Sequence, residues 1–136
     1  MGTKERNRVI RSSVKSPYRR FETERVMVRE VPLGPMPGFP LEIPRCVIEI
    51  LIKRGPASDS DLIMIAAEMK NRVLSLGKHY CAMAFHFWHD REKIGKEEAV
   101  AVIDYAPGGR WEDALKAKIG EYTQHTFKLI HNRTGG

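Results

Sequence analysis

The chain has little cysteine and no long apolar segment. Its 136 residues include two cysteines, Cys46 and Cys81, and no apolar run approaches the roughly 20 residues that a membrane helix needs. The N-terminus also lacks the apolar stretch of a secretory signal. Both cysteines fall in strongly apolar segments, which favours two buried thiols in a reducing compartment over a disulfide. We therefore expect a cytoplasmic protein with no membrane partner.

Sequence motifs for metals, nucleotides and phosphates are also missing. The chain has no Cys-x-x-Cys pair and no His-Glu-x-x-His helix, and its Gly108-Gly109 turn fits neither a Walker loop nor a dinucleotide loop. His86 and His89 are three residues apart on a predicted strand, so they point to opposite faces. The sequence therefore predicts no metal, no cofactor and no catalytic residue.

The net positive charge is concentrated at the N-terminus. Residues 1–20 contain seven basic residues and one acidic residue, whereas the rest of the chain contains 16 of each sign. We interpret residues 1–20 as a disordered basic tail and residues 21–136 as a single domain. Such a tail can contact nucleic acid or an acidic partner. The candidate contact residues are Arg6, Arg8, Arg11, Arg19 and Arg20.

Periodicity predicts an α+β domain with the element order β-β-α-β-β-short α-β. The helix at 58–77 begins at Ser58, where Asp61 completes a capping box. This helix joins the strands at 45–53 and 80–89 in a βαβ unit, whose strands should be parallel. We expect a two-layer domain with a mixed sheet of four to five strands and one long helix on one face. The other predicted elements are strands at 21–31, 99–105 and 126–131 and a short helix at 111–118.

The segment from Tyr80 to His89 is apolar on both faces, which is typical of a central strand. Strict alternation places Cys81, Met83, Phe85 and Phe87 on one face and Tyr80, Ala82, Ala84, His86 and Trp88 on the other. This strand and the strand at 99–105 should form a hairpin with a long charged loop. The last apolar segment, 126–131, fits a strand or a further helix, and we favour the strand.

Residues 32–44 form a proline-rich segment. It contains five prolines and two glycines in 13 residues, which excludes a regular helix or a central strand. It also carries large apolar residues, which a solvated loop would not need. We expect the segment to pack on the domain or to form a contact surface for a protein partner or a second copy of the chain.

The segment from 104 to 114 is a strand end, a Pro-Gly-Gly turn and a helix start. Junctions of this kind often carry binding groups. A ligand there would be held by Tyr105, Arg110, Trp111 and Asp113, with Asp104 or Asp113 available for proton transfer. The alternative is an architectural joint, in which Glu112 and Asp113 start the helix and Trp111 anchors it on the sheet.

The run Ala101–Ala114 resembles a motif in a family of small bacterial domains of unknown function. The shared pattern is Ala-x-x-(Asp/Glu)-(Trp/Tyr)-Ala-Pro-x-Gly-x-Trp-x-Asp-Ala, and the similarity extends over residues 22–131. The chain departs from the pattern at 32–44, where family members often have a short basic segment. The resemblance implies the α+β fold and a bacterial or phage context, and it implies no activity, cofactor or catalytic residue.

These observations favour a non-catalytic interaction module that binds a protein partner or a second copy of itself. Two alternatives remain open. The first is a small-ligand or enzymatic site at the 104–114 junction. The second is nucleic-acid association through the tail at 1–20.

Overall fold

The computed structural model describes residues 22–38, 40–54 and 58–134. The predicted basic tail, with Arg6, Arg8, Arg11, Arg19 and Arg20, lies outside the described residues. Within them are five strands, one α-helix and two 3-10 helices. They are β1 (Glu22–Glu30), β2 (Arg45–Arg54), α1 (Asp59–Leu74), β3 (Ala82–Trp88), η1 (Arg91–Lys93), β4 (Ala101–Pro107), η2 (Trp111–Lys116) and β5 (His125–Asn132).

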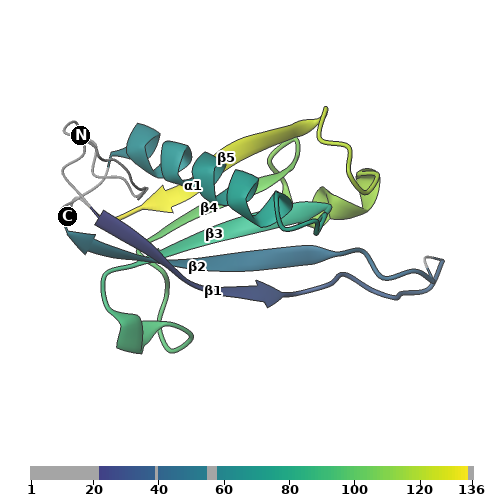
Figure 1. Cartoon of the computed structure of the whole chain (residues 1–136). Coiled ribbons are helices and arrows are strands. Elements are labelled where there is room, and N and C mark those ends of the chain that lie inside the picture. The colour runs from purple at the N-terminus through teal and green to yellow at the C-terminus, as the bar shows by residue number, and fades with distance from the viewer. Residues whose placement is uncertain (1–21, 39, 55–57, 135–136) are drawn as a thin grey trace.

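The strands form one mixed sheet in the order β1-β2-β3-β4-β5, which is also their order in the chain (Figure 1). β2 and β3 are parallel and adjacent, and the other three neighbouring pairs are antiparallel. The predicted α+β fold, the parallel pair joined by the helix and the β3–β4 hairpin are therefore confirmed. The last segment is a strand, as favoured, and the short helix before it is a 3-10 helix.

The helix α1 begins at the predicted capping box. The Ser58 hydroxyl accepts a hydrogen bond from the Asp61 N–H at 3.1 Å, and the Ser58 N–H donates to the Asp61 carboxylate at 3.2 Å. These two bonds satisfy backbone donors that the first turn leaves free. The apolar side chains recur at helical spacing and pack on the sheet. The buried residues of α1 are Leu62, Ile65, Ala66, Met69 and Val73.

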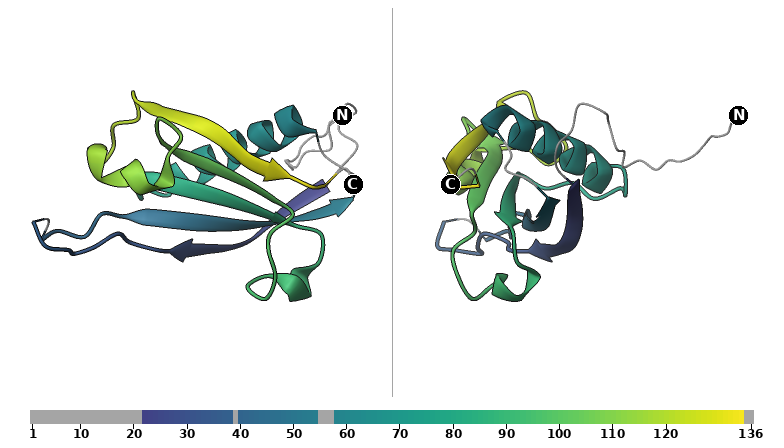
Figure 2. Two further views of the ribbon diagram at one scale, coloured as in Figure 1. Left: turned by 180° about the vertical axis from the view of Figure 1, so that it is seen from behind. Right: turned by 90° about the vertical axis from the view of Figure 1, so that its left-hand side faces the viewer.

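The sheet has one face covered by α1 and one face that we call the open face. Figure 2 shows α1 on one side of the sheet and the loop that carries η1 on the other. The main core lies beneath α1, where β2, β3 and β4 contribute alternate apolar residues such as Ile48, Phe85 and Ile103. The open face is more polar. Its residues include Val47, Glu49, Ala84, His86, Trp88, Val102 and Asp104.

The predicted alternation fails at the start of β3. Tyr80 belongs to the core beneath α1, whereas Cys81 packs against Ala82 and Ala106 on the other side of the sheet. The chain bends at Cys81 and becomes a strand only at Ala82. Period-two alternation therefore does not extend to these two residues, and Cys81 does not share a face with Met83 as the sequence predicted. Both Cys46 and Cys81 are buried free thiols, as expected.

The proline-rich segment is an extended arm that joins β1 and β2 (Figure 1). Leu33 and Ile43 form an isolated antiparallel bridge. Ile43 is buried and Leu33 packs beside it, so the base of the arm packs on the domain as predicted. Leu41, by contrast, is 71% exposed. In the part of the chain that the structure describes, no helix is long and apolar enough to cross a membrane.

Candidate functional site

The structure divides the predicted ligand residues between the two faces of the sheet. Tyr105 points into the core beneath α1, where its ring lies 4.4 Å from the Phe127 ring and 5.0 Å from the His125 ring, measured between centroids. Lys70 of α1 places its ammonium 5.0 Å from the centre of the Tyr105 ring. Tyr105 is therefore a core aromatic, and it does not join the other three residues in one site.

Arg110, Trp111 and Asp113 remain close to one another at the start of η2. Arg110 Nε donates to the Asp113 carboxylate at 3.1 Å, within one turn. Trp111 packs against the small cluster at the end of the open face, and the Arg45 guanidinium lies 4.4 Å from the centre of its ring. These contacts fit the architectural joint. Ligand binding at this junction stays a prediction.

Asp104 lies on the open face beside this joint. Its strand partners are Ala84 of β3 and Lys128 of β5. Burial and, to a smaller extent, the Glu112 carboxylate raise the pKa of the Asp104 carboxyl to about 6, against the opposing effect of Lys128. Asp104 is thus a half-buried carboxyl that changes its charge just below neutral pH.

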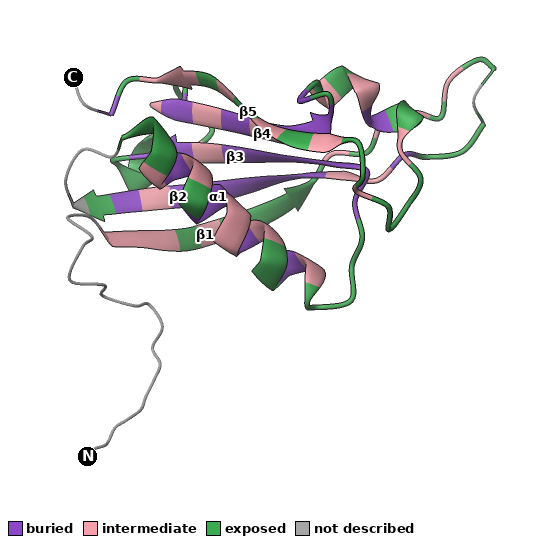
Figure 3. Ribbon diagram, turned by 90° about the horizontal axis from the view of Figure 1, so that it is seen from above, coloured by how far each residue is buried: buried purple, intermediate pink, exposed green. Residues whose placement is uncertain are grey.

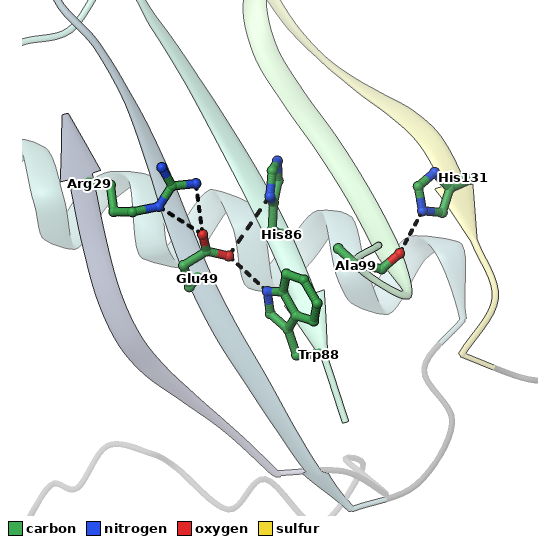
Figure 4. Close-up of polar contacts among 6 residues, drawn as sticks. All are labelled: Arg29, Glu49, His86, Trp88, Ala99 and His131. Carbon is green, nitrogen blue, oxygen red and sulfur yellow. Dashed lines mark hydrogen bonds and ion pairs between the residues drawn. The ribbon is translucent and has the colours of Figure 1, made fainter. Parts of the chain in front are cut away.

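A polar network on the open face is centred on Glu49, and the sequence did not single it out (Figure 4). The Glu49 side chain is 2% exposed. Arg29 of β1 donates to Oε2 from Nε at 3.0 Å and approaches it with Nη2 at 2.9 Å. Trp88 of β3 donates from Nε1 to Oε1 at 2.7 Å. The carboxylate therefore joins three neighbouring strands.

His86 is the fourth member of this network, and its Nδ1 lies 3.8 Å from Glu49 Oε1. Burial lowers the pKa of the His86 imidazole, Arg29 and His131 lower it further, and Glu49 opposes them. The imidazole is accordingly neutral at pH 7. The network holds one buried carboxylate with one guanidinium, so its main effect is to fix Arg29, and with it β1, on the sheet.

β1 is an edge strand whose outer side pairs with no strand among the described residues. The Val31 N–H donates to the Arg45 carbonyl, on the β2 side. In a strand, the N–H and C=O of one residue point to one side, and those of the next residue point to the other side. Val28 and Glu30 consequently turn their N–H and C=O groups away from β2, toward the outer side. A register shift between Arg25 and Met27 interrupts the strand before this stretch.

A groove follows β1 on the side of α1. Figure 3 shows α1 crossing the sheet obliquely, so that its C-terminal end lies toward β1. One cavity of about 380 Å³ lies there, and a second of about 220 Å³ continues toward the arm. Glu30, Lys78 and Tyr80 border both cavities. The first is also lined by Arg25, Val28, Val73 and Leu76, and the second by Pro32, Glu42, Pro44, Arg45 and His79.

Polar contacts order the ridge between the two cavities. The Tyr80 hydroxyl donates to Glu30 at 2.8 Å, and the Lys78 ammonium lies 3.5 Å from the same oxygen. The hydrogen bond from Tyr80 and the positive charge of Lys78 both lower the pKa of the Glu30 carboxyl. Burial and the bond to Glu30 raise the pKa of Tyr80. Tyr80 therefore stays a hydrogen-bond donor at neutral pH and holds the Glu30 carboxylate in place.

The sequence did carry a signal for Glu49, because it is the one charged residue between Cys46 and Ile52. A lone acid in a buried strand needs partners. The groove carried no such signal, since its walls come from β1 and from the residues around the end of α1. In the described part of the chain no group of three or more His, Cys, Asp or Glu side chains is arranged to hold a metal ion.

Comparison with known proteins identifies no relative. No protein-family model matches the chain, and neither the curated proteins nor the solved structures contain a significant match. The resemblance of Ala101–Ala114 to a bacterial family stays a prediction. The function must therefore be inferred from the geometry of this chain.

Proposed function

We propose that the domain is a non-catalytic interaction module that binds an extended segment of a partner protein along β1. The observation that carries the proposal is the position of Val28 and Glu30. Both residues turn their backbone N–H and C=O groups to the outer side of β1, and both line the groove with their side chains. An added strand gains main-chain hydrogen bonds at such an edge and selectivity from side-chain cavities.

The Glu49 network supports the proposal because it holds the edge strand still. Arg29 lies between Val28 and Glu30, and its guanidinium is fixed on a buried carboxylate. A rigid template loses less conformational entropy on binding than a mobile one. Edge strands are usually protected from pairing by bulges and charges. Here the register shift lies on the N-terminal side of Met27, so the stretch from Met27 to Glu30 is regular.

The substitution Val28→Pro tests the proposal. Proline removes the outward N–H of Val28 and leaves the β1–β2 bonds intact, since proline is tolerated where the N–H faces solvent. The control Val28→Ala shortens the side chain and keeps the N–H. The probe is a library of acetylated heptapeptides with threonine at alternate positions, titrated into ¹⁵N-labelled protein. We expect a peptide-dependent amide shift at Glu30 in the wild type and in Val28→Ala, and none at Glu30 in Val28→Pro, which has no amide proton at position 28.

Two results would overturn the proposal. One is the absence of any peptide-dependent shift along β1 at millimolar peptide. The other is a dimer of the chain itself through β1, detected by light scattering at several concentrations, because the edge would then already be paired. Circular dichroism and thermal unfolding of Val28→Pro check that the variant keeps the fold.

We further propose that this binding takes place in the cytoplasm. Cys46 and Cys81 are both free and buried, and thiols are kept reduced in that compartment. Residues 32–44, with the exposed Leu41 at the tip side of the arm, are a second candidate surface for the same partner. Replacing Leu41 by Ser should weaken binding of the partner protein and leave binding of a heptapeptide unchanged.

A further inference from the structure

We infer that the segment bound along β1 carries an apolar side chain and an acidic side chain two residues away from it. This inference rests on the proposed function and adds the chemistry of the partner. It is drawn from the side chains that surround the groove.

The spacing follows from strand geometry. Residues two apart on a strand point to the same face and lie about 7 Å from each other. Val28 and Glu30 are two apart on the groove side of β1. A strand paired with this edge therefore places one side chain beside Val28 and the next one on the same face beside Glu30.

The position beside Val28 is apolar. Val73 and Leu76 form the opposite wall of the cavity, which measures about 380 Å³. Leu76 is 70% exposed although it follows a helix whose other apolar residues are mostly buried. A side chain of the size of leucine would cover this surface and remove it from water, which favours binding.

The position beside Glu30 is basic, because Lys78 lies there and the charge of Glu30 is already partnered. The Glu30 carboxylate already accepts the Tyr80 hydroxyl and lies near Lys78. Lys78 is 65% exposed and borders both cavities, and an ammonium has three donors. Arg25 adds a second positive charge to the wall of the first cavity. The wall of the first cavity thus has one positive charge in excess, whereas in the second cavity Glu30 and Glu42 balance Arg45 and Lys78. A carboxylate that lies over Lys78 on the side of the first cavity complements this excess.

Four synthetic peptides test the inference. The parent is acetyl-Thr-Asp-Thr-Leu-Thr-Asp-Thr-amide, whose acids two residues before and after leucine fit either strand direction, and the others replace both Asp by Ser, both Asp by Lys or Leu by Ser. Dissociation constants come from amide shifts of Val28 and Glu30 in ¹⁵N-labelled protein. We expect the parent to bind best. Replacing both Asp by Ser should weaken binding about threefold, which is the range for an exposed ion pair.

Charge reversal on the protein gives the matched test. In Lys78→Glu the preference should invert, so that the Lys peptide binds better than the Asp peptide. Lys96→Glu is the control, because Lys96 is exposed in the loop of η1 and lies outside the groove. If Lys78→Glu proves unstable, Lys78→Gln should remove the preference without inverting it.

The outcomes separate the two proposals. Equal binding of all four peptides, with shifts along β1, would overturn the inference and leave the interaction module standing. The absence of shifts with these peptides and with the threonine library would overturn both. An unchanged preference in Lys78→Glu would show that the acidic residue is not recognised by Lys78, and it too would overturn the inference.

Discussion

Trp88 Nε1 lies 2.7 Å from Glu49 Oε1, and both residues are almost fully buried on the face of the sheet that α1 leaves open. The Trp88 indole donates to one carboxylate oxygen of Glu49, and the Arg29 guanidinium donates to the other. A carboxylate away from water is tolerated only with such partners. The network therefore makes a charged residue a structural part of an otherwise apolar strand.

Replacing Glu49 should destabilise the domain. Glu49→Gln keeps the shape, but either orientation of its amide turns the NH2 toward a donor, the Arg29 guanidinium or the Trp88 indole, so two donors face each other. We expect a loss of about 2–4 kcal/mol in the free energy of unfolding, which is the range for breaking a buried charged pair or bond. Urea denaturation measures it. Glu92→Gln, on the exposed 3-10 helix η1, is the control, and a Glu49→Gln loss below about 0.5 kcal/mol would contradict the prediction.

Asp104 should titrate near pH 6. Its folded pKa of about 6 exceeds the ordinary value of 3.8, chiefly through burial. The folded state then binds the proton more tightly than the unfolded state. The contribution of Asp104 to stability is full below pH 3.8 and is lost as the pH rises through about 6.

Two substitutions check this titration. Asp104→Asn should stabilise the domain at pH 7 by about 1 kcal/mol, a value reduced for solvent screening, and should give little gain at pH 4. Glu112→Gln should lower the pKa of Asp104, because the Glu112 carboxylate raises it. Carbon-13 NMR of the Asp104 carboxyl measures the pKa directly. An Asp104 pKa near the ordinary value of 3.8 in the wild type would refute the prediction.

Replacing Gly109 by alanine should destabilise the domain far more than replacing Gly108. Both have positive φ angles, 63° for Gly108 and 75° for Gly109. A Cβ on Gly108 would meet open space, whereas on Gly109 it would lie 2.8 Å from the Lys128 Cβ. Gly108→Ala should cost about 1 kcal/mol from backbone strain, and Gly109→Ala about 3 kcal/mol from strain and overpacking. Thermal unfolding compares the two variants, and equal losses would show that β5 moves aside freely.

Cys46 should resist thiol reagents until the domain unfolds. Burial, with a smaller contribution from the nearby Glu30 carboxylate, raises the pKa of the Cys46 thiol to about 12. Burial also raises the pKa of Cys81. Since the thiolate is the reactive species, labelling by an aromatic disulfide at pH 8 should be slow in buffer and rapid in urea. Fast labelling of either cysteine in native buffer would be the contrary result.

The fold was predictable because local patterns and topology agree. The capping box at Ser58, the alternation in β2 and the right-handed βαβ rule together predict the helix and the parallel pair. The alternation failed only where the chain bends at Cys81, before β3 begins. A bend between a helix and a strand leaves no signal in period-two spacing.

The candidate site was harder to predict because its parts are distant in the chain. The groove joins Val28 and Glu30 with Leu76 and Lys78, which are separated by more than 40 residues. Their proximity depends on the angle at which α1 crosses the sheet. Tyr105 and Trp111 are close in sequence, and yet they lie on opposite faces, because alternation along β4 and the turn after it separate them.

The agreement between strand order and chain order has a consequence for synthesis. As the chain leaves the ribosome, every strand after β1 finds its neighbour in the sheet already made, and three of the four neighbouring pairs can form without waiting for α1. Only the β2–β3 pair must wait until α1 has been translated and folded back. We expect the rate of folding to be governed by closing this one crossover, because the remaining contacts connect segments adjacent in the chain.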